Sequence, residues 1–272
     1  MSRLNTHNEE LRLASSNQIL SDFTQEATRI VNEGERAGIL LRLLGATAIM
    51  LHCPNYSYLF EKFGRTLTDL DFATYGKFRG KLEKFFVGLG YRSDRRTSYY
   101  FGEARHRYFD DINSRVVDIF FDKLSFCHTV PFNGRLELDS PTITLTDILL
   151  EKMQIVEINE KDIRDTIIML REHQIQDGEK ESVNADHISK LLASNWGFYY
   201  TVMTNLHNVK SFLDKYEALT PEDRRDVGSK IETLLKRIED EPKSMKWRTR
   251  AKIGTRRKWY TEVEDFRKDF KQ

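Results

Sequence analysis

The sequence predicts an α+β fold, in which a mixed β-sheet flanked by helices is followed by an all-helical C-terminal part. Short apolar runs that fit buried strands occur in the first half of the chain, and they alternate with helices that carry an apolar stripe. Beyond a polar, glycine-containing segment at 174–180, the apolar spacing is helical throughout. We therefore expect an N-terminal helix plus α/β domain over residues 1–178 and a helical domain over residues 179–272.

The elements of the α/β part are predicted from the residues that begin, fill and end them. Ser21-Asp22 can accept hydrogen bonds from the first amides of a helix. Runs rich in Val, Ile and Leu are typical of buried strands, and helical spacing of Phe and Leu marks the helix that Gly90 closes. In chain order we expect a frayed leader to residue 15, a helix over 21–38, a strand over 39–44, a turn at Gly45-Ala46, a helix over 47–52, a strand over 67–73, a helix over 77–89, strands over 99–109 and 115–122, and a short strand over 141–145.

The rest of the chain is predicted to be helical because its apolar residues recur every three or four positions. Pro221 after Thr220 is a common way to begin a helix. The expected helices cover residues 146–156, 161–173, 186–193, 196–213 and 221–239.

The composition is that of a soluble globular chain with a substantial core. Of the 272 residues, 39% are hydrophobic and 31% are charged, and the formal net charge is +1. Neither Cys53 nor Cys127 has a second cysteine or a paired histidine nearby at metal-ligand spacing, which argues against a zinc site. No apolar run reaches the ~20 residues needed to cross a bilayer, and residues 1–10 lack the apolar core of a signal peptide. We expect a cytoplasmic protein with buried free thiols and no membrane partner.

Asp69 and Asp71 form a candidate metal-binding pair. They lie one residue apart on a predicted strand, so their side chains project from the same face of the sheet. Two adjacent carboxylates repel each other, and burial increases the repulsion unless water or a divalent cation lies between them. The small-residue turn at Gly45-Ala46 is a place where a phosphate could approach backbone N–H groups. Together these features predict a Mg²⁺ site beside a phosphate site.

Asp118 supplies a third candidate carboxylate. It lies within the apolar strand predicted over 115–122, and burial of a carboxylate there is unfavourable unless a positive group meets it. If this strand lies beside the strand of Asp69 and Asp71, three carboxylates converge, as a two-metal phosphoryl or nucleotidyl transfer site requires. The third carboxylate could bridge a metal or take a proton from the nucleophile. A helix N-terminus or an arginine could instead satisfy Asp118 structurally, and an Asp-x-Asp pair could be surface decoration.

In this order, Gly45-Ala46, Asp69-x-Asp71 and Asp118 resemble the nucleotidyltransferase superfamily of the DNA polymerase β type. The chain is more narrowly similar to the bacterial group that includes the AbiEii-like toxins. That similarity also rests on the lead-in Arg65-Thr66-Leu67-Thr68, on the lysine-bearing run 149–153 and on Lys161-Asp162-x-x-Asp165, so that it spans roughly residues 39–171. The resemblance implies a nucleotidyltransferase-type mixed sheet.

The resemblance also implies roles for individual residues. It implies that Asp69, Asp71 and Asp118 bind Mg²⁺ at a two-metal site and are the catalytic residues. Ala46 stands where the group has Gly or Ser, so Thr47 would supply the missing hydroxyl. The implied nucleotide-binding residues are Gly45, Ala46, Thr47, Arg65 and Lys152. Asp162 and Asp165 could share in the site, or they could cap the helix or pair with nearby basic residues.

The segment 243–260 is a candidate nucleic-acid surface. It contains no Asp or Glu, and aromatic residues interrupt its basic residues, a combination that suits a phosphate backbone with stackable bases. Alternatively, the acidic runs at 239–241 and 262–265 neutralise this face, and Trp247 and Trp259 anchor helix packing. A smaller basic cluster could neutralise a triphosphate or be ordinary surface. That cluster consists of Arg92, Arg95, Arg96, Arg105 and Arg107.

The leading functional hypothesis is a Mg²⁺-dependent nucleotidyltransferase. It would transfer a nucleoside monophosphate from an NTP such as ATP to a hydroxyl acceptor and release pyrophosphate. The acceptor could be an RNA such as tRNA, a protein side chain or a small molecule. The toxin-like resemblance implies a toxin–antitoxin partner protein. The alternative is a catalytically silent protein of this fold that binds nucleotide or nucleic acid, or that acts as an interaction partner.

Overall fold

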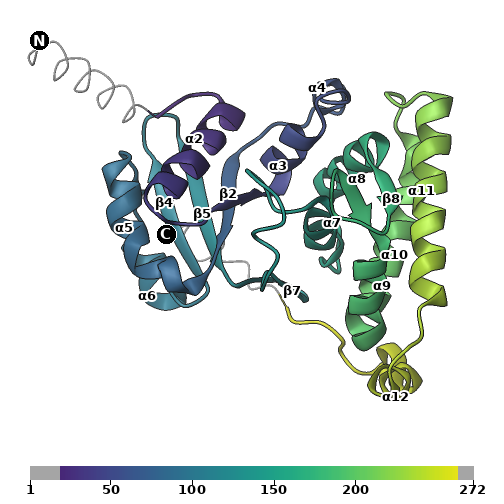
Figure 1. Ribbon diagram of the computed structural model, residues 1–272. Coiled ribbons are helices and arrows are strands. Elements are labelled where there is room, and N and C mark those ends of the chain that lie inside the picture. Colours follow the sequence, from purple (N-terminus) through teal and green to yellow (C-terminus); the bar gives the residue numbers. More distant parts are fainter. Residues whose placement is uncertain (1–18, 263–272) are drawn as a thin grey trace, which may run out of the picture. The chain divides into compact units, whose positions relative to one another are not determined.

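The computed structural model describes residues 19–262, which form two compact units (Figure 1). The sheet unit contains the described residues up to Ala48 together with Leu67–Lys123 and Phe132–Ile143. The helical unit contains Ile49–Thr66, Leu124–Pro131 and the described residues from Thr144 onward. The division at residue 178 stays a prediction, and the predicted leader before residue 15 lies outside the described residues.

A five-stranded mixed sheet forms the centre of the sheet unit, as the sequence predicts. The strand order is β1-β2-β5-β4-β3, in which β2 and β5 pair in parallel and the other neighbours are antiparallel (Figure 1). The strands are β1 (Arg42–Leu44), β2 (Asp69–Thr74), β3 (Arg92–Ser93), β4 (Arg105–Asp110) and β5 (Arg115–Phe121).

The two faces of this sheet have different environments. One face is apolar, and α5 packs on it through Phe86, whose ring stacks on that of Tyr108 with the centroids 4.4 Å apart. The opposite face holds Asp69, Asp71 and Asp118, and much of it is only half-buried. The helices of the unit are α2 (Phe23–Arg36), the first turn of α3 (Gly45–His52), α5 (Arg79–Gly88) and α6 (Arg95–Phe101), with a short 3₁₀ helix, η1 (Gly76–Phe78).

Two predicted strands need correction. The sequence predicts a strand over 99–109, but α6 ends at Phe101 and β4 begins at Arg105. The Asp94 side chain accepts hydrogen bonds from the amides of Arg96 and Thr97, and this cap begins a helix that the weak alternation conceals. The predicted strand over 141–145 is only a single bridge from Thr142 to Leu43. Helix α7 begins at Leu145, the last residue of this predicted strand, and the Thr144 side chain caps the helix.

The helical unit consists of packed helices and very short strands. Both of its cysteines, Cys53 and Cys127, are buried free thiols. The parallel pair β8–β9 lies in and just after the segment predicted as a polar linker, because strands of three residues carry no detectable periodicity. Its elements are α4 (Tyr58–Lys62), β6 (Lys123–Ser125, which begins at the unit boundary), β7 (Thr129–Pro131), α7 (Leu145–Met153), α8 (Glu160–Glu172), β8 (Gln174–Gln176), β9 (Ser182–Asn184), α9 (Ala185–Ser194), α10 (Trp196–Phe212), η2 (Leu213–Lys215), α11 (Pro221–Asp240), α12 (Met245–Ile253) and η3 (Gly254–Arg256).

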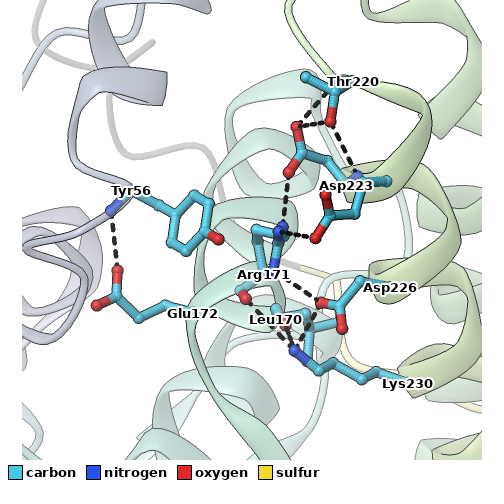
Figure 2. A network of polar contacts seen from close by, with 9 residues as sticks. Tyr56, Leu170, Arg171, Glu172, Thr220, Asp223, Asp226 and Lys230 are labelled. Carbon is cyan, nitrogen blue, oxygen red and sulfur yellow. Dashed lines mark hydrogen bonds and ion pairs between the residues drawn. The ribbon is translucent and has the colours of Figure 1, made fainter.

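Hydrogen bonds and ion pairs of charged side chains link the end of α8 to α11 (Figure 2). Lys230 is 7% exposed and donates hydrogen bonds to the carbonyl oxygens of Leu170 at 2.9 Å and Arg171 at 3.3 Å. It therefore satisfies carbonyls that have no partner within the helix. Arg171 Nε donates to Asp223 Oδ1 at 2.6 Å. Both contacts hold the C-terminal turn of α8 in place.

None of the helices within residues 19–262 has the length and apolarity required to cross a bilayer.

His128 makes the stability of the helical unit depend on pH. Its ring stacks on Phe198, its Nε2 lies 2.8 Å from Thr201 Oγ1, and burial lowers its pKa to about 4. Because the unfolded chain takes up a proton below about pH 6.5 and the folded chain resists it, stability is full above pH 6.5 and falls toward pH 4. We expect His128 to account for about 2 kcal/mol of lost unfolding free energy between pH 7 and pH 5. Urea unfolding of His128→Gln at both pH values should lack this loss, and an unchanged pH dependence would contradict the assignment.

Candidate active site

The register of the sheet brings the three predicted carboxylates onto one face of adjacent strands. Asp71 on β2 lies directly opposite Asp118 on β5, and Asp69 lies opposite Val116. Residues paired in this way project from the same face. The predicted geometry of the carboxylates, on neighbouring strands and one face, is therefore confirmed, whereas their role as metal ligands stays a prediction.

Two arginines on the neighbouring strand β4 hold the carboxylate of Asp118. Arg107 lies opposite Asp118, and its Nε donates to Oδ1 at 2.9 Å while its Nη2 donates to Oδ2 at 3.2 Å. Arg105 Nε donates to the same Oδ1 at 2.8 Å, and its Nη2 donates to Oδ2. Asp118 is 4% exposed, so the two guanidinium groups compensate a buried charge. Compensation of Asp118 by arginine is the alternative to metal binding that the sequence leaves open.

The charge on this face shifts the pKa of Arg107. Burial alone would lower the pKa of this guanidinium, but the Asp118 carboxylate raises it, and Asp94 and Asp71 add to the increase. The net direction is upward, so Arg107 stays cationic beside the carboxylates.

The turn at Gly45 lies against Asp71. Leu44, the last residue of β1, pairs with Asp71, and Gly45 follows it with a φ of +76°. The positive φ favours glycine here, and a Cβ atom at Gly45 would lie 3.0 Å from Asp71 Oδ2, so the Asp71 side chain would have to shift by a few tenths of an ångström. Helix α3 begins at this turn, so the positive end of its dipole lies beside Asp71. Within the described chain, the buried Thr47 Oγ1 has no hydrogen-bond partner.

Asp69 and Asp71 have the chemistry that Mg²⁺ requires. Both carboxylates are half-buried rather than enclosed, and Asp69 Oδ1 accepts one hydrogen bond, from Thr68 Oγ1 at 3.1 Å. Asp118 has the right register, but its two oxygens are shared by guanidinium groups. Among residues 19–262, the three aspartates do not form a set with all ligand atoms within 4.8 Å of one another. The carboxylate oxygens of the Asp69–Asp71 pair are of the kind that suits Mg²⁺, whereas both oxygens of Asp118 are held by Arg105 and Arg107.

Arg65, Lys152, Asp162 and Asp165 form an ionic network of the helical unit. Lys152 is 7% exposed, and its Nζ lies 3.1 Å from Asp165 and 3.2 Å from Asp162. Arg65 Nε donates to Asp165 at 2.9 Å. Burial alone would lower the pKa of Lys152, but Asp165, Glu151 and Asp162 raise it, and the net shift is upward. Asp162 and Asp165 thus pair with basic residues, as the alternative interpretation holds, while nucleotide contacts of Arg65 and Lys152 stay predictions.

The tryptophans of the segment 243–260 anchor packing within the helical unit. Trp247 packs edge-on against Tyr199, with the ring centroids 5.1 Å apart, and Trp259 Nε1 donates to Thr201 Oγ1 at 3.1 Å. Lys258 pairs with Glu262, which belongs to the neighbouring acidic run. The exposed basic residues of the segment are Lys246, Arg248, Lys252, Arg256, Arg257 and Lys258.

The smaller basic cluster divides into two groups. Arg105 and Arg107 bind Asp118, whereas Arg92 pairs with Asp111 at 2.7 Å on the surface. Arg95 on α6 is exposed, and so are Tyr99 and Tyr100, at 83% and 70%. The sequence indicates that these aromatics interrupt the basic residues, but it does not reveal that a helix presents them to solvent.

Comparisons with protein-family models, with curated proteins and with solved structures find no match for this chain. The resemblance to nucleotidyltransferases that the sequence suggests therefore rests on the motif residues alone.

Proposed function

We propose that the protein is a Mg²⁺-dependent nucleotidyltransferase. It transfers a nucleoside monophosphate from an NTP such as ATP to a hydroxyl and releases pyrophosphate. The observation that carries this proposal is the pairing of Asp71 with Asp118 in adjacent parallel strands, directly beside the Gly45 turn at the start of α3. A carboxylate pair next to the N-terminus of a helix supplies, in one place, ligands for a cation and a favourable position for a phosphate.

In this proposal the residues of the sheet unit bind and orient the reactants. Mg²⁺ would neutralise the triphosphate and lower the pKa of the acceptor hydroxyl. Asp69 and Asp71 hold the cation, and Asp118 completes the set of carboxylates. Backbone N–H groups from Gly45 to Thr47 bind phosphate oxygens. Catalysis is mainly electrostatic and positional, since the carboxylates fix charges before reaction.

Arg105 and Arg107 are positioning residues in this proposal. Their paired hydrogen bonds fix the orientation of the Asp118 carboxylate on the sheet face. If Asp118 contributed to a cation site, one of the two guanidinium groups would be available to a phosphate oxygen. Arg65 and Lys152 belong to the helical unit, and their contact with the triphosphate rests on the resemblance alone.

The acceptor proposed first is an RNA such as tRNA. It is supported by the exposed basic residues of the segment 243–260, which suit a phosphate backbone. A toxin–antitoxin partner protein is proposed on the resemblance.

One observation favours a second candidate function. Both oxygens of Asp118 already accept hydrogen bonds from Arg105 and Arg107. If these arginines never release Asp118, the protein is a catalytically silent member of the fold that binds nucleotide or nucleic acid.

A labelling assay distinguishes the two functions. The protein is incubated with each α-³²P-labelled NTP, with Mg²⁺ or Mn²⁺ and with total tRNA, and the label is followed into RNA, protein and small molecules. We expect metal-dependent transfer that is lost in Asp69→Ala. The matched control is Asp111→Ala, an exposed carboxylate of the same unit that pairs with Arg92, and it should keep the activity. Metal-dependent NTP binding without transfer would favour the silent protein, and neither NTP binding nor transfer would contradict both the nucleotidyltransferase and a silent nucleotide-binding protein.

A further inference from the structure

His52, His173 and Glu181 meet in the helical unit, although they lie far apart in the sequence. His52 ends α3, His173 follows α8, and Glu181 lies immediately before β9. One nitrogen of each imidazole and a carboxylate oxygen of Glu181 all lie within 4.8 Å of one another. The two histidines are 9% and 6% exposed. We propose that these residues form a structural Zn²⁺ site, separate from the proposed nucleotidyl-transfer site and independent of it.

The distances between the donor atoms are close to those that zinc requires. The Nδ1 atoms of His52 and His173 each lie 3.8 Å from Glu181 Oε2. In a tetrahedral site with bonds of ~2.0–2.2 Å, two ligand atoms are ~3.4 Å apart. Movement of a few tenths of an ångström, largely by the exposed Glu181 side chain, therefore brings these atoms to bonding distance.

The hydrogen bonds of His173 aim its Nδ1 at the site. Its Nε2 lies 2.9 Å from the carbonyl oxygen of His52, which can only accept, so Nε2 carries a proton. In the neutral ring the lone pair is then on Nδ1, which faces Glu181. Metal-binding histidines are commonly oriented by a carbonyl in this way.

The backbone of Glu181 supplies a possible fourth ligand. Its carbonyl oxygen lies 3.2 Å from His173 Nδ1. Two lone pairs at this distance repel each other unless a proton or a cation lies between them. Glu181 also has a φ of +48°, a left-handed conformation that is uncommon for residues other than glycine. This backbone conformation accompanies the approach of both its carbonyl and its side chain to the histidines.

The surroundings of the cluster hold its ligands in place. Glu172 accepts a hydrogen bond from the Tyr56 amide at 2.9 Å (Figure 2). Lys230 also links the end of α8 to α11. His173, which directly follows α8, is therefore held in place.

The donor set selects the metal. Two imidazole nitrogens and a carboxylate suit Zn²⁺, whereas Mg²⁺ prefers oxygen ligands. The ion would join the end of α3, the end of α8 and the segment before β9, and would stabilise the helical unit. The sequence gives no sign of the site because His52 and His173 are not at motif spacing.

Zinc binding by the full chain tests the proposal. Untagged protein is treated with a chelator, desalted and supplied with ZnCl₂, and bound zinc is measured by mass spectrometry. We expect one Zn²⁺ per chain and, at a free zinc concentration one hundred times the Kd, an increase in Tm of about 5–10 °C. MgCl₂ should give neither effect. His207→Ala removes an exposed histidine of α10 and should bind zinc like the wild type.

Glu181→Gln and His52→Ala should each lower zinc affinity at least tenfold and, at the same free zinc concentration, reduce the zinc-dependent increase in Tm to about half or less. Glu181 is largely exposed, so its variant is expected to fold, and circular dichroism confirms this before zinc is added. Zinc binding below one ion per five chains in the wild type would overturn the proposal. Equal affinity in Glu181→Gln and the wild type would also overturn it, because the zinc would then be bound elsewhere.

Discussion

Replacing Asp71 with asparagine is expected to reduce nucleotide transfer by roughly a thousandfold or more, equivalent to about 4 kcal/mol of transition-state stabilisation. Asp71 lies between the Gly45 turn and Asp118, so it is the carboxylate in contact with both halves of the proposed site. Asparagine keeps its shape but removes the charge that would hold a cation. The measurement is the initial rate of label transfer at saturating NTP, together with Tm.

The expected stability of Asp71→Asn distinguishes a chemical role from a structural one. Its half-buried carboxylate faces both the repelling charge of Asp118 and the attracting charge of Arg107, so loss of its charge should lower Tm less than Asp118→Asn does. Asp118→Asn is the matched comparison. It should lose both activity and about 1–3 kcal/mol of unfolding free energy, because Arg105 and Arg107 lose their common partner. An Asp71→Asn variant with full activity would contradict the assignment of the site.

The sequence predicts which residues share the carboxylate face of the sheet because local patterns specify them. Alternation places Asp69 and Asp71 on one face of β2, and the apolar run at 115–122 is long enough to identify β5. The parallel pairing of these strands is seen only in the structure. The Gly45 turn was recognised from composition, and its φ of +76° accounts for the glycine.

The partners of the buried charges could not be predicted in the same way. Arg105 and Arg107 are identified as partners of Asp118 only once β4 is recognised as a short strand that follows a helix over 95–101. The sequence signal that begins this helix is a single residue, the Asp94 cap. Arg65 and Asp165 are a hundred positions apart, and His52 and His173 are farther apart still. Such pairs depend on how helices pack, which one sequence leaves unspecified.

Replacing Asp165 with alanine is expected to destabilise the protein more than any surface substitution, by about 3–5 kcal/mol. Asp165 is fully buried, and its carboxylate meets both Arg65 and Lys152, whose side chains are 9% and 8% exposed. Without Asp165, the buried cations Arg65 and Lys152 keep only part of the negative charge that balances them. Chemical unfolding by urea measures the loss.

The remaining members of the network allow this mechanism to be separated from a simple cavity effect. Asp162→Ala removes a more exposed carboxylate, 15% exposed, from the same lysine and should cost only about 1 kcal/mol. Adding Lys152→Met to Asp165→Ala should recover part of the stability, because it removes one of the uncompensated charges. A double variant as unstable as the sum of its single variants would show that lost packing, not the orphaned cation, causes the damage. Recovery would mean that Lys152 depends on Asp165 to remain buried, so that a phosphate could attract Lys152 only in competition with that carboxylate.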